Sequence, residues 1–193
     1  MKTNRLHYWF KCSIMQSYYM QITIFCYYLF MHRNYIGGDL LRAICCFAGH
    51  SKLYDAEEIY EHLLYVIENL ISVENIGEFW VGNYGDFDKL CAKAVREVKV
   101  KYPNIQLNLV IPYLTSEINE YKESYYKNYD HILVADMPEK TPKKARIIKC
   151  NQYMVINSQV LVCYVKYSWG GAVKTLEYAQ KRSGIKIINL VNE

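Results

Sequence analysis

The feature that most constrains the fold is an alternation of short apolar runs with longer segments of helical periodicity. The apolar runs predict strands at residues 42–47, 78–81, 105–111, 131–135, 159–165 and 186–191. The segments between them predict helices at residues 55–71, 87–102, 143–157 and 171–182, with an irregular helix over 116–126. Strands that alternate with helices and are apolar throughout are typical of a parallel sheet with helices on both faces. We therefore expect an α/β fold, a Rossmann-like three-layer sandwich with a mostly parallel sheet.

The composition fits one domain with an extension. The chain has 193 residues, of which 52% are hydrophobic, so it can bury a sizeable core. Its net charge is +4, but residues 1–39 hold four cations and one anion, which leaves the remainder nearly neutral. A protein that binds nucleic acid directly usually shows a basic patch or stripe. The charge therefore argues against direct binding to nucleic acid.

The seven cysteines indicate a reducing compartment. Their number is odd, no C-x-x-C pair is present, and Cys45, Cys46 and Cys163 fall within predicted strands. Buried, reduced thiols in a cytoplasmic protein are the simplest interpretation. No group of Cys and His has the spacing of zinc ligands, so we expect no metal site. Nothing in the chain predicts a cofactor.

Residues 1–40 read as an N-terminal extension before a domain at residues 41–193. Residues 12–31 carry no charge, and a segment of this length could span a membrane, but several polar residues interrupt it. A second interpretation is a translated leader or a mis-assigned start. Gly37-Gly38-Asp39 can be encoded by a ribosome-binding sequence, and Leu41 by a TTG start codon a few bases downstream. A genuine extra element is the third. We favour the leader, and we expect contact with a membrane only if residues 12–31 are a real anchor.

Three turns at the carboxyl ends of predicted strands carry the candidate binding residues. In parallel sheets, ligands bind at these ends, and glycines there let the backbone approach a phosphate at the start of a helix. The first turn contains Gly49 and His50. The second and third turns supply Gly82, Asn83, Tyr84, Gly85, Asp86 and Asp88, and then Trp169, Gly170, Gly171 and Thr175.

Taken together, these turns resemble the SLOG superfamily, particularly its YpsA- and YoqJ-like branch. The resemblance covers about Leu41 to Leu190. It is carried by Phe47-Ala48-Gly49-His50, by Gly82-Asn83-Tyr84-Gly85-Asp86-Phe87-Asp88, by residues 149–155 with Asn157-Ser158, and by Ser168-Trp169-Gly170-Gly171 followed by residues 175–179. It implies a Rossmann-like fold and adds Asn151 and Met154 to the candidate ligand-binding residues.

The superfamily also includes the LOG phosphoribohydrolases, which remove the base from nucleotides, and the DNA-processing protein DprA. By this resemblance, Glu177 matches the glutamate that assists cleavage in LOG enzymes. The chain departs from the LOG signature at Val173 and Lys174, and Cys150 and Gln152 stand where relatives often carry arginine. Arginine binds phosphate through two parallel hydrogen bonds, which cysteine and glutamine cannot form. These departures weaken the prediction of catalysis more than the prediction of binding.

Three functions follow in order of preference. The first is a binding or sensing module for a nucleotide or nucleotide-sugar ligand. The second is a LOG-like N-glycosidase in which Glu177 is catalytic and Asp86 or Asp88 orients the ribose or a water. The third is a DprA-like DNA-processing or regulatory interaction protein. Dimers are common among LOG-like relatives, so by analogy we also consider a homodimer.

Overall fold

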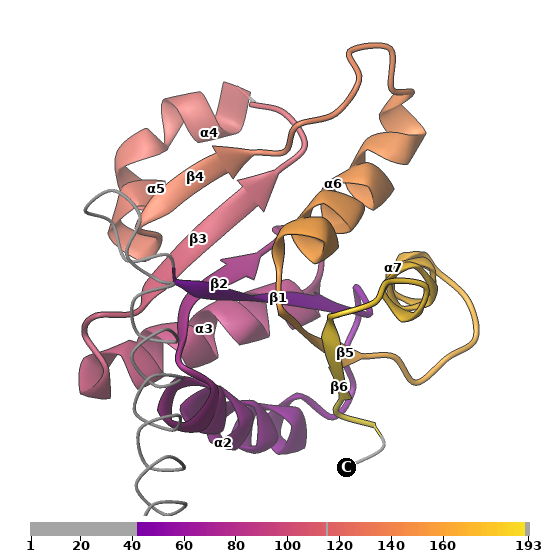
Figure 1. Cartoon of the computed structure of the whole chain (residues 1–193). Coiled ribbons are helices and arrows are strands. Elements are labelled where there is room, and N and C mark those ends of the chain that lie inside the picture. The colour runs from indigo at the N-terminus through magenta and orange to yellow at the C-terminus, as the bar shows by residue number, and fades with distance from the viewer. Residues whose placement is uncertain (1–41, 115, 192–193) are drawn as a thin grey trace, which may run out of the picture. The chain divides into compact units, whose positions relative to one another are not determined.

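The computed structural model describes residues 42–114 and 116–191. Their strands form one six-stranded sheet in the order β4-β3-β2-β1-β5-β6, and every pairing between neighbours is parallel (Figure 1). The strands are β1 (Ala43–Gly49), β2 (Ile76–Val81), β3 (Gln106–Ile111), β4 (His131–Val134), β5 (Val160–Tyr164) and β6 (Lys186–Asn189). The predicted extension at residues 1–40 lies outside the described residues.

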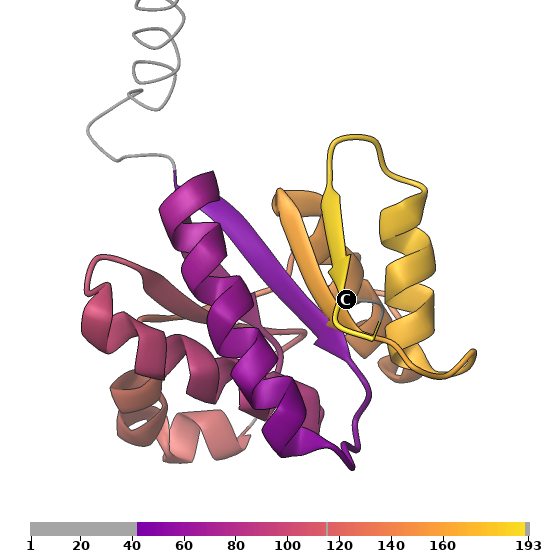
Figure 2. The same cartoon turned by 90° about the horizontal axis from the view of Figure 1, so that it is seen from below.

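Helices cover both faces of the sheet, as Figures 1 and 2 show. The helices are α2 (Ala56–Glu74), α3 (Asp86–Lys101), α4 (Ser116–Glu120), α5 (Lys122–Asn128), α6 (Lys143–Asn157) and α7 (Gly171–Gln180). Buried residues of α2 and α3 pack with Phe47, Phe79 and Val162 on one face of the sheet. Buried residues of α6 and α7 pack with Cys46 and Leu161 on the other face. The fold is therefore the three-layer, Rossmann-like α/β sandwich that the sequence predicts.

The predicted elements are confirmed, with three differences. The sheet is parallel in all of its described pairings rather than in most of them. The irregular helix predicted over 116–126 is two short helices, α4 and α5, and the second ends at Asn128. Strand β2 starts at Ile76, earlier than predicted, because Asn75 ends α2 in the left-handed conformation with φ of 55°. The chain therefore turns from helix to strand within one residue.

The predicted burial of the strand cysteines is confirmed. Cys45, Cys46 and Cys163 are fully buried and free. Burial raises the pKa of the Cys46 and Cys163 thiols to about 12, which makes both unreactive at neutral pH. Within residues 42–114 and 116–191, no helix is long and apolar enough to cross a membrane. The candidate span at residues 12–31 lies outside this part of the chain.

The turns after β1 and β2 are packed directly against each other. A Cβ placed on Gly85 would lie 2.7 Å from the Cα of Ser51, and the backbone N–H of Asp86 donates to the Ser51 carbonyl at 2.9 Å. A Cβ on Gly49 would lie 2.4 Å from the Phe87 ring. These contacts hold the start of α3 against the end of β1. The two glycines are thus required by packing inside the protein.

We expect Gly85→Ala to destabilise the fold by about 1–3 kcal/mol, because the new methyl group must displace backbone. The φ of Gly85 is −157°, which any residue adopts, so the cost is steric. The matched control is Gly171→Ala, since a Cβ at that position meets nothing within 4 Å. Urea denaturation of both variants measures the difference. Equal stability of the two variants would show that the backbone at Ser51 can accommodate a methyl group on residue 85, and would contradict the prediction.

Candidate functional site

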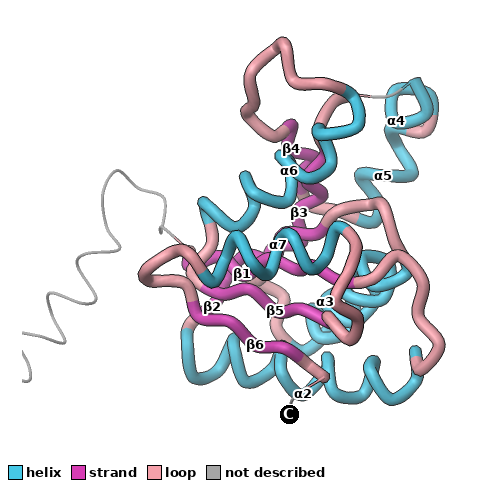
Figure 3. The backbone as a smooth tube through the Cα atoms, turned by 90° about the vertical axis from the view of Figure 1, so that its right-hand side faces the viewer, coloured by secondary structure: helices cyan, strands magenta, loops and turns pink. Residues whose placement is uncertain are grey.

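The candidate site lies at the carboxyl edge of the sheet, where β1 has β2 on one side and β5 on the other. The chain proceeds from β1 through β2 and β3 to β4, and then returns to add β5 and β6 on the opposite side of β1. The loops that follow β1 and β5 therefore lead away to opposite faces of the sheet, to α2 and α7 (Figure 3). In open α/β sheets, this reversal creates the crevice that receives ligands.

His50 follows β1 and is engaged by the neighbouring strand end. Its side chain is buried, with 8% exposed. The ring nitrogen Nε2 accepts a hydrogen bond from the backbone N–H of Lys166 at 3.0 Å and from that of Tyr167 at 3.2 Å. Burial lowers the pKa of His50 from its ordinary value of 6.5. The sequence predicts His50 as a ligand-binding residue, and the structure gives its Nε2 two partners within the protein.

The backbone amides of the turn after β2 are bound by a nearby carboxylate, that of Asp88. Asp88 lies in the first turn of α3, and its Oδ2 accepts a hydrogen bond from the backbone N–H of Tyr84 at 2.9 Å. The backbone N–H of Gly85 is a second donor to this carboxylate. Gly82 is buried above it, and a Cβ on Gly82 would lie 3.1 Å from Asp88 Oδ2. The Tyr84 and Gly85 amides, which could otherwise bind a phosphate, thus already donate to the Asp88 carboxylate.

The charge of Asp88 is costly where it lies. Burial raises the pKa of Asp88 to about 6, although the Tyr84 and Gly85 amides act in the opposite direction. Asp86, at the first position of the same helix, is exposed to solvent. Tyr84 is part of the same turn, and burial raises the pKa of its hydroxyl to about 12. Of the predicted second-turn residues, Tyr84 and Asp86 are exposed, Asn83, Gly85 and Asp88 are half-buried, and Gly82 is buried.

The turn after β5 is open. Gly170 has a φ of 104°, which favours glycine, and it precedes α7 without any side-chain hydrogen bond to cap the helix. A Cβ on Gly170 or Gly171 would meet nothing within 4 Å. Trp169 is 70% exposed and stacks on Tyr167 with ring centroids 5.8 Å apart. The amino terminus of α7 is therefore accessible beside an exposed aromatic pair.

The remaining predicted residues lie on α6 and α7. The Thr175 hydroxyl donates to the Gly171 carbonyl at 3.0 Å and accepts from the Asn151 amide at 3.3 Å, so both residues fix the start of α7. Met154 is buried in the core beneath α6. Glu177, the candidate catalytic residue, is exposed on α7. The structure thus brings Asn151 and Thr175 to the third turn and places Met154 away from solvent.

Cys150 and Gln152, where the chain departs from the pattern that it resembles, serve other contacts here. Cys150 is buried, and its Sγ lies 3.7 Å from the Val110 carbonyl. Gln152 accepts a hydrogen bond from Lys149 Nζ at 3.0 Å. Neither side chain carries the positive charge that an arginine would supply.

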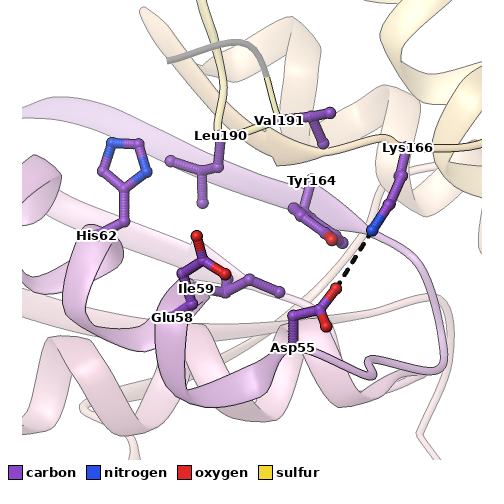
Figure 4. A pocket seen from close by; sticks show the side chains of 8 residues that line it. All are labelled: Asp55, Glu58, Ile59, His62, Tyr164, Lys166, Leu190 and Val191. Carbon is purple, nitrogen blue, oxygen red and sulfur yellow. Dashed lines mark hydrogen bonds and ion pairs between the residues drawn. The ribbon is translucent and has the colours of Figure 1, made fainter.

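A cavity that sequence reasoning missed lies between the start of α2 and the ends of β5 and β6 (Figure 4). Its volume is about 290 Å³. It is lined by Asp55, Glu58, Ile59, His62, Tyr164, Lys166, Leu190 and Val191. Lys166 Nζ pairs with Asp55 at 3.2 Å across one end. None of the predicted site residues lines this cavity, although Lys166 directly precedes Tyr167 in the β5–α7 loop. The position of Lys166 directly before the predicted third turn is the sequence signal that could have found it.

No group of three or more His, Cys, Asp and Glu side chains could hold a metal ion within the part of the chain that the structure describes.

The partly buried charge of Asp88 leads to a stability prediction. The folded pKa of about 6 exceeds the ordinary value of 3.8, so the stability due to this group is full below pH 3.8 and falls as the pH rises through 6. Asp88→Asn retains an oxygen acceptor for the Tyr84 amide and removes the charge. We expect this variant to be more stable than the wild type by about 1 kcal/mol at pH 8 and to lose that advantage toward pH 4.

Thermal unfolding between pH 4 and pH 8 measures this difference. The matched control is Asp86→Asn, which removes an exposed acid from the start of the same helix. It should lower the free energy of unfolding by a few tenths of a kcal/mol, and by about 1 kcal/mol at most. A difference between Asp88→Asn and the wild type that does not change with pH would contradict the assignment.

Comparison with known proteins supports the fold alone. No family model matches the chain, and no curated protein matches it significantly. Among solved structures, the fold is similar to that of DNA processing protein A (DprA) from Streptococcus pneumoniae, with a TM-score of 0.53 and 16% sequence identity. The match covers 76% of this chain and 49% of the DprA chain, so this chain spans about half the length of that protein. The chain thus has a Rossmann-like α/β fold similar to that of part of DprA.

Proposed function

We propose that this chain binds a phosphorylated nucleotide-type ligand, with a phosphate at the start of α7, and acts as a binding or sensing module. The observation that carries the proposal is the open turn at Gly170 and Gly171. Both glycines have free space where a Cβ would lie, and α7 has no side-chain cap. Unsatisfied N–H groups and the helix dipole favour an anion at such a helix start. The turn also lies at the reversal of strand order, where this fold places its ligands.

The contrast between the second and third turns supports this choice. A phosphate at the turn after β2 would meet the Asp88 carboxylate, which already accepts from the Tyr84 and Gly85 amides. Like charges at such short range repel strongly in a buried site. Residues 165–171, which form the turn after β5, include no Asp or Glu, and the Asp55 carboxylate that approaches this loop is paired with Lys166. We therefore place the phosphate at Gly170 and Gly171.

The same loop offers groups for the rest of a nucleotide. Trp169 and Tyr167 form an exposed aromatic pair on which a base can stack. The Lys166 ammonium is about half exposed in its pair with Asp55, so an anionic ligand can compete for it. A ligand with both a base and phosphate satisfies these groups better than inorganic phosphate does. Membership of the YpsA- and YoqJ-like branch of the SLOG superfamily is part of this proposal and rests on the sequence motifs.

A negative charge at the open turn should abolish binding. We expect Gly171→Asp to leave the free protein as stable as the wild type, or more stable by about 0.3–1 kcal/mol, because an acid suits the first turn of a helix. Ligand stabilisation should be lost, since the new carboxylate repels phosphate. Thermal shift with ADP-ribose, NAD and nucleoside monophosphates measures both effects.

The matched control is Ser183→Asp, which adds the same charge at an exposed position before β6, at the opposite edge of the sheet. For wild type and control, a ligand at 100 times its Kd should add about 2.7 kcal/mol of stability. If no ligand of the panel stabilises the wild type, the proposal is wrong.

The LOG-like alternative is tested in the same samples. Glu177 is exposed on α7, in the helix that begins at the proposed phosphate site. If the protein is an N-glycosidase, free base accumulates from a bound nucleotide, and Glu177→Gln lowers its rate of release by two or more orders of magnitude, about 10²–10⁴-fold. Chromatography of the products measures the base. Stabilisation by ligand without release of base would favour the binding module.

A DprA-like role in DNA processing is the third alternative. The near-neutral charge of residues 40–193 argues against direct contact with DNA and leaves an interaction with another protein.

A further inference from the structure

The ends of β1 and β5 are joined through one ring nitrogen. His50 Nε2 accepts hydrogen bonds from two consecutive backbone amides, those of Lys166 at 3.0 Å and Tyr167 at 3.2 Å. A neutral imidazole has one nitrogen that accepts and one that donates, whereas an imidazolium has two donors. The two bonds therefore require an unprotonated Nε2 and place the proton of the neutral ring on Nδ1. Protonation would direct an N–H group at two other N–H groups.

The ring is packed so that it cannot swing away without opening the loop. It is 8% exposed, and it lies against the Tyr167 ring with centroids 4.9 Å apart and edge-on to Tyr164 at 6.3 Å. Tyr167 stacks in turn on Trp169, which directly precedes Gly170. A continuous series of contacts thus links His50 to the open turn.

The charged groups around His50 do not account for its titration. On the loop after β5, the Lys166 ammonium is paired with Asp55 from the loop after β1. From α3, Asp86 is exposed, and its backbone N–H is bonded to the Ser51 carbonyl. Tyr164 and Tyr167 face the ring with their aromatic groups. Burial is the cause that lowers the pKa of His50 below 6.5, and no carboxylate raises it.

We propose that His50 is a positioning residue that holds the β5–α7 loop in its ligand-binding form only while its imidazole is neutral. Protonation of His50 releases the Lys166 and Tyr167 amides, and the loop loses the fixed course that presents Trp169, Gly170 and Gly171 to a ligand. Binding at the open turn is therefore gated by pH. The gating of a ligand rests on the proposed function, whereas the state of the loop does not.

The direction of the pH effect follows from the burial of the ring. Because the folded pKa is lowered, the stability that the neutral ring contributes is full above pH 6.5 and is lost as the pH falls through the folded pKa. Below that pKa, the competent fraction of the protein falls about tenfold per pH unit, and the apparent Kd rises by the same factor.

The first experiment follows the loop without any ligand. In the full chain, ¹⁵N NMR of the imidazoles reports the protonation state of His50, and hydrogen exchange reports protection of the Lys166 and Tyr167 amides. We expect an unprotonated Nε2 at pH 7.5, and protection that is lost on acidification together with the titration of His50. Exchange rates are corrected for the intrinsic dependence of exchange on pH.

Three variants separate positioning from simple packing. His50→Gln carries an oxygen near the place of Nε2 and does not titrate, so it should keep both amides protected at pH 7.5 and at an acidic pH at which the wild-type imidazole is protonated. His50→Ala should leave them unprotected at both pH values. His131→Gln, an exposed histidine at the start of β4, is the matched control and should behave as the wild type. A protonated Nε2 at pH 7.5, or the same loss of protection in His50→Gln as in the wild type, would overturn the proposal.

The second experiment measures binding of ADP-ribose, whose diphosphate does not change charge in this pH range. We expect the wild type to bind about tenfold more weakly for each pH unit below the pKa of His50, and His50→Gln to show no such loss. A loss of equal size in both proteins would overturn the gating. Absence of binding at every pH would count against the proposed function, and the amide protection would still decide the role of His50.

Discussion

The parallel pairing of β1 with both β2 and β5 is the constraint on which the rest of the structure depends. Cys45 and Cys46 of β1 align with Phe79 and Trp80 on one side and with Val160 and Leu161 on the other. A strand bonded on both edges and covered on both faces must be apolar throughout, and residues 45–48 are all buried. Because β5 joins β1 only after the chain has reached β4, the loops after β1 and β5 diverge. This divergence is a consequence of the strand order.

The glycines of the candidate site perform two opposite physical tasks. Gly49, Gly82 and Gly85 remove side chains where the protein packs against itself, against Phe87, Asp88 and Ser51. Gly170 and Gly171 leave space that nothing in the described structure fills. The first group supports the edge of the sheet, and the second leaves one helix start accessible. A motif with two glycines therefore does not by itself indicate a phosphate site.

The absence of arginine at positions 150 and 152 has a structural counterpart. Position 150 faces the core beneath α6, where Cys150 packs with Met154 and Val155. Burial of a guanidinium there without a partner would be unfavourable, so cysteine is compatible with this packing. The positive charge at the proposed site comes instead from the amino end of α7 and from Lys166 in the adjoining loop. This arrangement is more consistent with binding than with the LOG reaction.

The sequence by itself determined the order and type of the elements and the three turns at the carboxyl edge. These depend on local periodicity and on glycines next to strand ends, which are visible within short windows. Only the tertiary structure decided which turn is open, because the Asp88 carboxylate folds back on its own turn and the residues around Gly170 do not.

Only the tertiary structure also showed that His50 forms hydrogen bonds within the protein, to the backbone of the loop after β5. Its partner Lys166 is 116 positions away along the chain, and no local pattern reports a bond between such distant residues. The same holds for the cavity beside α2, whose walls come from the start of a helix and the ends of two distant strands. Contacts of this kind depend on the strand order of the whole sheet, which propensity and spacing do not specify.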